Sequence, residues 1–507
     1  MSAPEVLIVG AGPTGLVLGL SLLRRGVPFR IIDEDDGPGL QSRAIVVQAR
    51  TLELYDQLGL ADGAIERGIV MRDVRLLEGG REVARFSLGD LGEGLSPYPF
   101  ALILPQDDHE RFLVEQLSAA GVEVDWGVKL ERFTERGGLV SVTTMRKRRQ
   151  ETADVGWLVG CDGARSRVRK GLALDFPGGT YEQPFYVADV SVAGGFRTDL
   201  AVSLGAGGLA LMFPVRSSGM QRLIGLAPER AENAPPLTFE DVRASAESML
   251  GVAVETVNWF SAYRVHHRVA ARFRVGRVMI AGDAGHIHSP AGGQGMNTDI
   301  GDAVNLGWKL AEVVQGRAPE TLLDSYERER LAFARQLVST TDRAFRGFID
   351  DGARGRLLRR WIAPQLAPRL LRMGAARRAA FRTLSQIGVS YRDSGDGEGR
   401  AGQIHAGDRL PWIATGNGNF EALRTAHWQV HIHGQPSGSV RRAATELGLP
   451  LVERPWDAGA ERAGFTRDAL YLVRPDGYLA LVSADADAGV LRRFVGRHRS
   501  AREVADG

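Results

Sequence analysis

Short apolar runs that end in glycine or an acidic residue recur along the chain and predict buried strands. Val6–Val9, Phe29–Ile32 and Val278–Ala281 are such runs, and short apolar segments bounded by turn residues are typical of strands covered on both faces. Leu16–Leu23 reads as an apolar helix after the first run, and apolar residues recur at helical spacing from about Asn297 onward. The pattern therefore predicts an α/β fold in which strand, turn and helix alternate.

The hydrophobic pattern changes further along the chain and indicates additional domains. Between about Leu174 and Val275, short alternating runs separated by Gly, Ser and Pro predict a sheet-rich insert. From Arg317 to Arg392 we expect helices. With 507 residues the chain exceeds one hydrophobic core and should form two or three domains. In the tail we expect strand, helix, strand, strand, strand and helix over Trp428–Ile432, Val440–Leu447, Leu451–Arg454, Leu470–Val473, Leu479–Val482 and Gly489–His498.

The turn after the first strand carries a glycine motif typical of nucleotide-binding folds. Gly10-Ala11-Gly12-Pro13-Thr14-Gly15 joins a strand to a helix, so backbone amides at the helix N-terminus can approach a pyrophosphate. Asp33 ends the next strand at about the spacing expected for an acid that binds ribose. Glu34 and Asp35 are adjacent alternatives, and a solvated turn is the purely structural interpretation of these acids.

A second glycine-rich turn precedes the helix expected from about Asn297. The strand before it ends in Gly282-Asp283, which supplies an acceptor-only carboxylate. The loop glycines let backbone N–H groups approach a flat or anionic ligand. No Lys-Ser or Lys-Thr pair follows Gly295, so a nucleotide-hydrolase loop is excluded. Asp299 falls in the expected first helical turn, where a carboxylate suits the helix dipole.

The stretch GDAGHIHSPAGGQGMN resembles the second flavin fingerprint of the single-component FAD-dependent aromatic hydroxylases, typified by para-hydroxybenzoate and phenol hydroxylases. The resemblance implies a tightly but non-covalently bound FAD, with Asp283 at the ribityl hydroxyls. Gly285 stands where alanine is common, and Asp299, which could also tune the flavin, stands where glycine is common. The loop residues that the resemblance assigns to the cofactor, most of them along the isoalloxazine edge, are Pro290, Gly293, Gln294, Gly295, Met296 and Asn297.

Three further stretches match the same family. The stretch WLVGCDGARSRVR matches its DG fingerprint, which places Asp162 beside the flavin and the nicotinamide phosphates. Arg43 in QSRAIVVQ and Gln106 in LILPQDD correspond to residues that contact the cofactor. Leu130 corresponds to a position with backbone contacts to adenine. Three arginines after Asp162 are open to two interpretations, phosphate attraction or a solvated helix face: Arg165, Arg167 and Arg169.

The resemblance implies a monooxygenase that hydroxylates a phenolic or polycyclic aromatic substrate. NADPH or NADH would reduce FAD, O2 would add at C4a, and the flavin C4a-hydroperoxide would oxidise the ring, while the protein orients the reactants and excludes water. The substrate would lie over the flavin, against the sheet-rich insert, and no catalytic side chain is assigned. Candidate aromatic or apolar walls are Met212, Phe213, Pro214, Trp259, Phe260 and Tyr263.

Two other functions remain open at this point. One is another flavin-dependent oxygenase, of the epoxidase or Baeyer-Villiger type; a halogenase is disfavoured because the WxWxIP motif is absent. The other is a non-catalytic, flavin-loaded binding protein. NAD(P)H oxidation stimulated by a phenolic ligand would exclude the second of these.

The C-terminal segment resembles the thioredoxin-like domain that follows many phenol, polyketide and rifampicin-type hydroxylases. The position of a redox motif reads HIHGQPSG and has no cysteine, so a packing or assembly role is expected. The expected domains are an FAD-binding domain with a Rossmann-like fold over 1–173 and 276–345, a substrate-binding β-sheet domain over 174–275, a helical connector over 346–400 and the thioredoxin-like domain over 401–507.

Composition and charge narrow the class of partner. A net charge of +2 argues against nucleic acid. Cys161 is the single cysteine, which excludes an intramolecular disulfide and a cysteine-based metal cluster and suits a reduced cytoplasm. No apolar run is long enough to cross a bilayer, and the N-terminus lacks a leader pattern. We expect a cytoplasmic monomer or homodimer without a metal, a nucleic-acid partner or a membrane partner.

Overall fold

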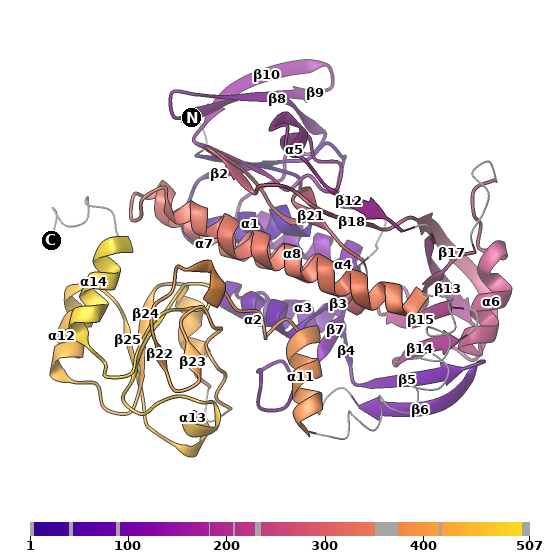
Figure 1. Ribbon diagram of the computed structural model, residues 1–507. Coiled ribbons are helices and arrows are strands. Elements are labelled where there is room, and N and C mark those ends of the chain that lie inside the picture. Colours follow the sequence, from indigo (N-terminus) through magenta and orange to yellow (C-terminus); the bar gives the residue numbers. More distant parts are fainter. Residues whose placement is uncertain are drawn as a thin grey trace.

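The computed structural model describes residues 5–39, 44–87, 92–181, 183–205, 208–228, 235–289, 291–349, 374–414 and 418–498. Figure 1 shows a central α/β body, a large sheet at the right, a small sheet at the top and a C-terminal domain at the lower left. The long helix α8 (Leu322–Ile349) runs across the front of the body, between the small sheet at the top and the C-terminal domain. The predicted α/β class is confirmed.

A five-stranded sheet with order β19-β20-β11-β1-β2 forms the centre of the body. β1 pairs in parallel with β2 and with β11, β11 pairs in parallel with β20, and only β19 is antiparallel. Every residue of β1 is buried, as expected of a strand covered on both faces. The strands are β1 (Val6–Val9), β2 (Phe29–Ile32), β11 (Trp157–Gly160), β19 (Arg274–Val275) and β20 (Val278–Ile280).

Helices and a second sheet enclose the central sheet in one hydrophobic core. α1 (Pro13–Leu23) is apolar and buried, and it packs against α7 (Gly295–Val314) and α4 (Gln106–Ala119). A Cβ built on Gly307 of α7 would lie 2.4 Å from Ser21 Oγ of α1, so the missing side chain allows the two helices to approach closely. The sheet β10-β9-β8, shown at the top of Figure 1, consists of β8 (Val128–Arg136), β9 (Leu139–Arg146) and β10 (Arg149–Val155).

Several short elements complete the body. The turns that follow β20 form the 3-10 turns η1 (Gly282–Ala284) and η2 (Ala291–Gly293), which lead into α7. The sheet β3-β7-β4 links the body to the large sheet. The remaining elements are β3 (Val46–Val47), β4 (Ile69–Met71), β7 (Ala101–Ile103), α2 (Ala49–Leu58), α3 (Ala61–Arg67) and α5 (Arg167–Gly171).

The large sheet has seven strands in the order β17-β13-β16-β15-β14-β5-β6. β5 and β6 come from residues 73–87, which the predicted boundaries assigned to the other domain, so residues 174–275 do not form this sheet alone. β5 pairs in parallel with β14, a long-range contact that strand periodicity does not report. The elements are β5 (Asp73–Glu78), β6 (Arg81–Ser87), β13 (Phe185–Val192), β14 (Leu200–Gly205), β15 (Gly208–Val215), β16 (Met220–Leu226), α6 (Glu240–Leu250) and β17 (Val254–Tyr263).

A further three-stranded sheet, distinct from β8–β10, connects the sheet-rich insert to the second half of the central body. Its strand order is β12-β18-β21, so the turn after β20 pairs with the end of the insert. The strands are β12 (Gly178–Thr180), β18 (His266–Val269) and β21 (His286–Ile287).

The C-terminal domain contains the strands and helices in the predicted order. Its four-stranded sheet has the order β25-β24-β26-β27, with β24 parallel to β25 and antiparallel to β26. The likeness to thioredoxin stays a prediction. The elements are β22 (Arg400–Ala401), β23 (Ile404–His405), η5 (Glu421–Thr425), β24 (Gln429–His433), α12 (Gly438–Glu446), β25 (Leu451–Arg454), α13 (Ala458–Arg462), β26 (Leu470–Val473), β27 (Leu479–Ser483) and α14 (Ala488–His498).

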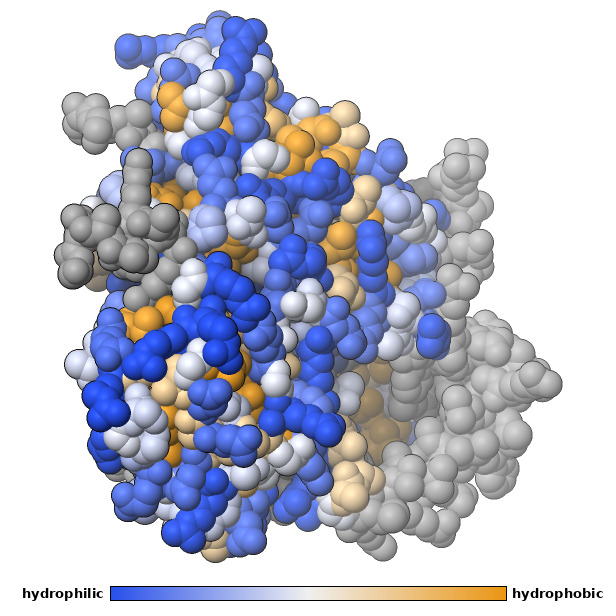
Figure 2. Space-filling view, turned by 60° about the vertical axis from the view of Figure 1, so that its left-hand side comes forward, coloured by the Kyte–Doolittle hydropathy of each residue, from blue (hydrophilic) through white to orange (hydrophobic). Residues whose placement is uncertain are grey.

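The predicted helical connector is described only in part. Helix α8 extends past residue 345 to Ile349, α11 spans Gly374–Leu384, and η4 (Arg392–Ser394) precedes the C-terminal domain. Residues 350–373 lie outside the described residues. Among the described residues, no helix combines the length and apolar character needed to cross a membrane. On the described part of the face in Figure 2, hydrophilic residues predominate and hydrophobic residues form small separate groups.

Candidate functional site

The carboxyl ends of β1, β11 and β20 bring three turns of the chain together. Gly10 has φ +105°, and a Cβ built on it would lie 2.3 Å from the Cys161 carbonyl oxygen. A Cβ on Gly282, which has φ +64°, would lie 2.4 Å from Thr14 Oγ1. Both positions require glycine because a side chain fits neither the left-handed backbone nor the contact. Turns far apart in sequence thus meet at the sheet edge where α/β folds bind ligands.

The first turn leaves an open position at the N-terminus of α1. Gly12 caps the helix with an extended backbone and Pro13 begins its first turn. A Cβ on Gly12 would meet no atom within 4 Å, whereas a Cβ on Gly15 would lie 1.9 Å from the Gly10 carbonyl oxygen. The first amide groups of a helix have no acceptor inside it and favour a negative charge. The arrangement therefore fits a pyrophosphate at Gly12.

Asp33, rather than Glu34, faces this glycine turn. Asp33 Oδ2 accepts a hydrogen bond from the Ala11 N–H at 2.6 Å, and Asp33 Oδ1 accepts one from the Asp35 N–H at 2.9 Å. Partial burial raises the pKa of Asp33, and the two backbone bonds oppose that rise. Glu34 is exposed and its carboxylate lies 3.3 Å from Lys129 Nζ. Of the adjacent acids Asp33 and Glu34, only Asp33 is hydrogen-bonded to the glycine turn in the described residues.

Leu130 and Gln106 lie on two elements beside Asp33. Leu130 is buried in β8, the strand whose Val128 N–H donates to the Asp33 carbonyl oxygen at 2.8 Å. Gln106 begins α4, and its Nε2 donates to Glu110 Oε1 at 2.9 Å. Burial raises the pKa of Glu110, and nearby Asp33 adds to the rise. Glu110 is a residue of this region that the sequence motifs did not identify.

The Asp162 carboxylate caps helix α5. Its Oδ1 accepts a hydrogen bond from the Ser166 hydroxyl at 2.5 Å, and its Oδ2 accepts the N–H groups of Arg167 and Val168 at 2.6 and 3.1 Å. A Cβ on Gly10 would also lie 2.9 Å from the Asp162 nitrogen. Asp162 therefore shapes the site by fixing the end of β11 and the start of α5 against the first glycine turn.

The three arginines after Asp162 divide into two classes. Arg165 and Arg167 are exposed, in agreement with a solvated helix face. Arg169 is buried, and its Nη1 donates to the Ala284 carbonyl oxygen at 2.8 Å. This arginine braces the η1 turn that carries Asp283, a structural role that neither interpretation of the sequence included.

Asp283 lies exposed in η1, beside a buried ionic group centred on Asp302 of α7. The Asp302 carboxylate accepts the Gly282 N–H at 3.0 Å, His286 Nε2 at 2.7 Å and Arg330 Nε at 2.5 Å. Burial opposes ionisation of Asp302, but the Arg330 guanidinium and His286 hold its pKa below the usual range. The group fixes the turn that presents Asp283.

Asn297 holds the loop that precedes α7, and its side-chain amide is fully used. Asn297 Oδ1 accepts the Gln48 N–H at 2.8 Å and the Thr51 hydroxyl at 2.7 Å. Its Nδ2 donates to the carbonyl oxygens of Val46 and Gly293, each at 2.9 Å. Because an amide group has two donor hydrogens and two main acceptor directions, only the backbone of Asn297 remains for a ligand.

The rest of this loop leads directly into α7. The helix begins at Gly295, with Gln294 as its cap, rather than at about Asn297 as the pattern predicted. Asp299 is therefore the fifth helical residue, and the expectation that it lies in the first turn is wrong. Met296 is buried, with its sulfur 3.4 Å from His109 Nδ1. Arg43 and Pro290 lie outside the described residues.

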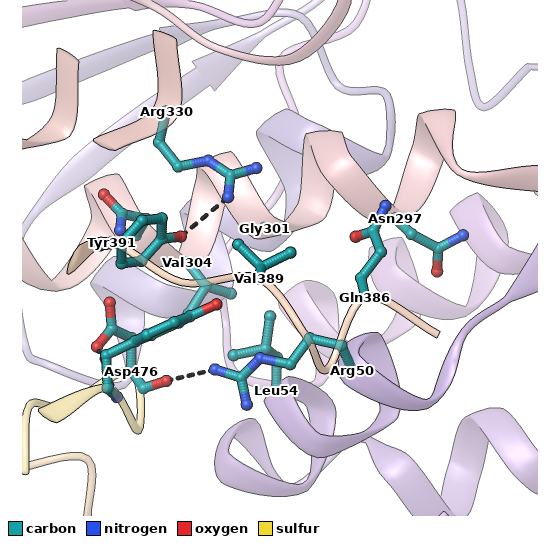
Figure 3. Close-up of a pocket in the computed structure, with 12 residues that line it drawn as sticks. Arg50, Leu54, Asn297, Gly301, Val304, Arg330, Gln386, Val389, Tyr391 and Asp476 are labelled. Carbon is teal, nitrogen blue, oxygen red and sulfur yellow. Dashed lines mark hydrogen bonds between the residues drawn. The ribbon is translucent and has the colours of Figure 1, made fainter. Parts of the chain in front are cut away.

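A cavity of about 20 Å³ is lined by residues of α7 and of the C-terminal domain (Figure 3). This volume holds about one water molecule. On its walls Arg50 Nη2 donates to the Asp476 carbonyl oxygen at 2.7 Å, and Arg330 Nη1 donates to the Tyr391 hydroxyl at 2.9 Å. Asn297, which holds the glycine loop, and Asp476 of the C-terminal domain both line this cavity. The loop and the C-terminal domain therefore meet at the cavity.

Comparison with known proteins identifies the family of this chain. Residues 3–341 match the family model described as FAD binding domain. The chain is 36% identical to 6-methylpretetramide 4-monooxygenase of Streptomyces rimosus, over 94% of this chain and 90% of that protein. It is 30% identical to rifampicin monooxygenase of Rhodococcus hoagii, over 99% and 100%. The crystal structure of an aromatic hydroxylase from angucycline biosynthesis superimposes with a TM-score of 0.78 at 29% identity, covering 98% of this chain and 100% of that one.

Proposed function

The chain belongs to the flavin-dependent monooxygenases that carry this FAD-binding domain, and on that premise we propose that it hydroxylates a phenolic or polycyclic aromatic substrate with NADPH or NADH as reductant. The overall reaction converts an aromatic C–H, O2, NAD(P)H and a proton into the phenol, water and NAD(P)+. Bound FAD supplies the redox chemistry, in which a flavin C4a-hydroperoxide is the expected oxidant. The protein supplies position, electrostatics and a dry environment.

The meeting of three turns at one sheet edge is the observation that supports the assignment of the FAD site. The N-terminus of α1 at Gly12 would hold the pyrophosphate, and Asp33 would accept from the adenosine ribose. Asp283, at the end of β20, would accept from the ribityl hydroxyls. The start of α7 at Gly295 would lie at the ring, where its partial positive charge would stabilise negative charge on reduced flavin.

The strands of the large sheet separate the candidate walls of the substrate site into two sets. Met212 and Phe260 belong to the hydrophobic cluster on the α6 side of the sheet. Trp259 and Tyr263 belong to the cluster on the opposite face, with Val46 packed against it. A Cβ on Gly293 of the flavin loop would lie 3.2 Å from Val46 Cβ. Successive strand residues point to opposite faces, so we assign the substrate to the face that carries Trp259 and Tyr263.

The C-terminal domain is proposed to be a thioredoxin-like unit with a packing role. Its β26–β27 turn contributes Arg474 and Asp476 to a buried ionic group with Glu329 and Lys309 of the flavin domain. The whole chain is expected to act in the cytoplasm, as a monomer or a homodimer.

The test is ligand-stimulated turnover with isotope labelling. Purified holoprotein is incubated with NADPH or NADH, 18O2 and a panel of phenols and polycyclic phenols. We expect an aromatic ligand to accelerate NAD(P)H oxidation and to acquire one 18O atom on its ring. Oxygen inserted into a C–C bond or added across a double bond would establish the Baeyer-Villiger or epoxidase alternative. A flavin-loaded protein that no ligand stimulates would be a binding protein.

Two variants distinguish the two faces of the large sheet. Trp259→Ala should alter KM or the uncoupling of NAD(P)H oxidation from product while the protein keeps FAD. Phe260→Ala, its neighbour on the opposite face, should lower stability without changing the ligand preference. The reverse pattern would reject the assigned face.

A further inference from the structure

Asp299 is a carboxyl group at the proposed FAD site that the family pattern does not require, because glycine is common at its position. It is the fifth residue of α7, and its side chain is only 13% exposed. Charged groups are rarely buried unless they are paired. Its environment therefore decides whether this carboxyl is charged.

Two unpaired polar atoms face each other at this position. Asp299 Oδ1 is buried without a hydrogen-bond partner among the described residues, and so is His286 Nδ1, at a distance of 3.9 Å. His286 is 1% exposed, and its Nε2 lies 2.7 Å from the Asp302 carboxylate. Since that carboxylate is ionised and can only accept, Nε2 of a neutral His286 carries the proton and Nδ1 is an acceptor. A proton on Asp299 would complement this acceptor, whereas a carboxylate would face its lone pair.

The charged and titratable groups around Asp299 also disfavour a negative charge there. Burial raises the pKa of Asp299 well above its usual value, Asp283 on η1 and Asp302 on α7 raise it further, and Arg330 on α8 lowers it. His286 on β21 faces it as described above. Two further buried groups, Cys161 directly after β11 and Tyr326 on α8, have pKa values that the Asp299 charge would raise. Asp283 and Asp302 thus oppose the ionisation of Asp299, and Arg330, which is already bonded to Asp302, favours it.

We propose that Asp299 is a positioning residue of the FAD site that holds its proton, adds no charge beside Asp283, and makes FAD binding weaken as the solution becomes alkaline. A protonated Asp299 adds no charge next to Asp283 or to the pyrophosphate of FAD. When Asp299 ionises, a second carboxylate at this edge repels both Asp283 and the cofactor. The inference rests on the proposed FAD site and not on the identity of the substrate.

The experiment measures the FAD dissociation constant of the refolded or deflavinated full-length protein by fluorescence titration between pH 6 and pH 9. For the natural chain the constant should rise with pH, by at most tenfold per pH unit for one proton. Asp299→Asn stays neutral and polar, and it should bind FAD at pH 6 within a few-fold of the natural chain and without that rise. Asp299→Gly should also lose the rise. Asp393→Asn, at an exposed acid of η4, is the matched control and should keep it.

A rise that persists in Asp299→Asn would overturn the proposal, as would a natural chain whose affinity does not change with pH. FAD affinity more than tenfold lower in Asp299→Asn at pH 6 would also overturn it, because a charged carboxylate would then be needed. Asp283→Asn identifies the other failure: if it leaves FAD affinity unchanged, the FAD site itself is misassigned. Apo-protein melting gives a second readout, in which Asp299→Asn should be more stable than the natural chain at pH 8.

The sign of that second readout follows from the raised pKa of Asp299. An acid whose pKa is higher in the folded state binds its proton more tightly when folded. Stability is then lost as pH rises from the unfolded value toward the folded value. The asparagine variant has no such loss, so its advantage should grow with pH up to the folded pKa. A variant that is less stable than the natural chain at every pH would indicate a purely structural role.

Discussion

Arg474 of the C-terminal domain is the residue whose removal should separate that domain from the flavin domain. Its guanidinium is 7% exposed and bonds to Glu329 Oε1 on α8 and to Asp476 Oδ2 in its own turn, each at 2.6 Å. Lys309 Nζ lies 2.8 Å from the same Glu329 carboxylate, so two positive and two negative groups balance inside the interface. Arg474→Met keeps most of the volume and leaves the two carboxylates with one cation, Lys309.

The expected loss of unfolding free energy follows from the burial of the ion pairs that Arg474 makes. Removing one partner of a buried ion pair costs about 3 to 5 kcal/mol, a shift of roughly 150- to 5000-fold in the unfolding equilibrium. In urea this corresponds to a midpoint lowered by roughly 1 M or more. Arg441→Met is the matched control, because Arg441 and its partner Glu453 have side chains 48% and 35% exposed, and exposed pairs contribute about 0 to 1 kcal/mol.

Tryptophan fluorescence during urea unfolding is the assay, because the interface contains its own reporter. Trp308 of α7 and Trp428 next to β24 meet edge to face, with ring centroids 5.5 Å apart. Arg474→Met should lower the urea concentration at the midpoint of the transition that separates these rings. Adding Glu329→Gln should restore part of the loss, because it removes one of the two carboxylates and leaves Lys309 and the nearby Asp476 as one cation and one anion. A midpoint within 0.3 M of the Arg441→Met variant, a margin of about 1 kcal/mol, would refute the reasoning.

Three more predictions concern single positions. Gly12→Val should fold, because φ −73° with an extended ψ suits any residue, but the purified protein should lose the yellow colour of FAD. Gly496→Val, also in open space, is the control and should stay yellow. Full flavin occupancy of Gly12→Val would reject the pyrophosphate site. Asp283→Ala should weaken FAD binding by about tenfold to somewhat over a hundredfold, the value of roughly 1.5 to 3 kcal/mol for a hydrogen bond to a charged group, with Asp283→Asn milder; a fallen apo-protein melting temperature at unchanged affinity would show a structural role instead. Burial lowers the pKa of His433 to about 4, so folding loses stability as pH falls below about 6.5, by roughly 1.4 kcal/mol per unit. His433→Phe should remove roughly 2 to 3 kcal/mol of the loss between pH 6.5 and 4.5, whereas an equal gain from His427→Phe, at an exposed site, would contradict burial as the cause.

Local patterns predicted much of the fold, because strand and helix periodicity is a property of neighbouring residues. β1, β2 and β20 appear where apolar runs predicted strands, and the C-terminal elements appear in the predicted order. The predicted boundaries placed residues 73–87 in the FAD-binding domain, and the pairing of β5 with β14 was not foreseen because β14 lies more than a hundred residues away. Strand pairing over such a separation depends on tertiary structure, which a single sequence does not display.

The site was predictable at its glycines and less so at its polar side chains. Gly10 and Gly282 require their residue type for backbone and contact reasons, so a motif identifies them. Asn297 and Asp162 belong to motifs as well, yet the side chains of both accept hydrogen bonds from backbone N–H groups of the protein itself. The sequence left Arg169 open between phosphate attraction and a solvated helix face, and only the fold brings the Ala284 carbonyl to it. Hydrogen-bond partners of this kind depend on distances that sequence spacing does not encode.

Helix α7 shows why the stretch around it carries so much information. Its apolar positions, such as Ile300 and Ala303, lie in the flavin-domain core. A second face carries Asn297 and Gly301, which line the cavity next to the C-terminal domain. Asp302, on another face, accepts the Gly282 N–H and so holds the η1 turn at the proposed FAD site. Because one helix joins these three environments, side chains on its different faces are constrained by different neighbours. A polar substitution on any of these faces should therefore disturb the glycine loop that precedes the helix.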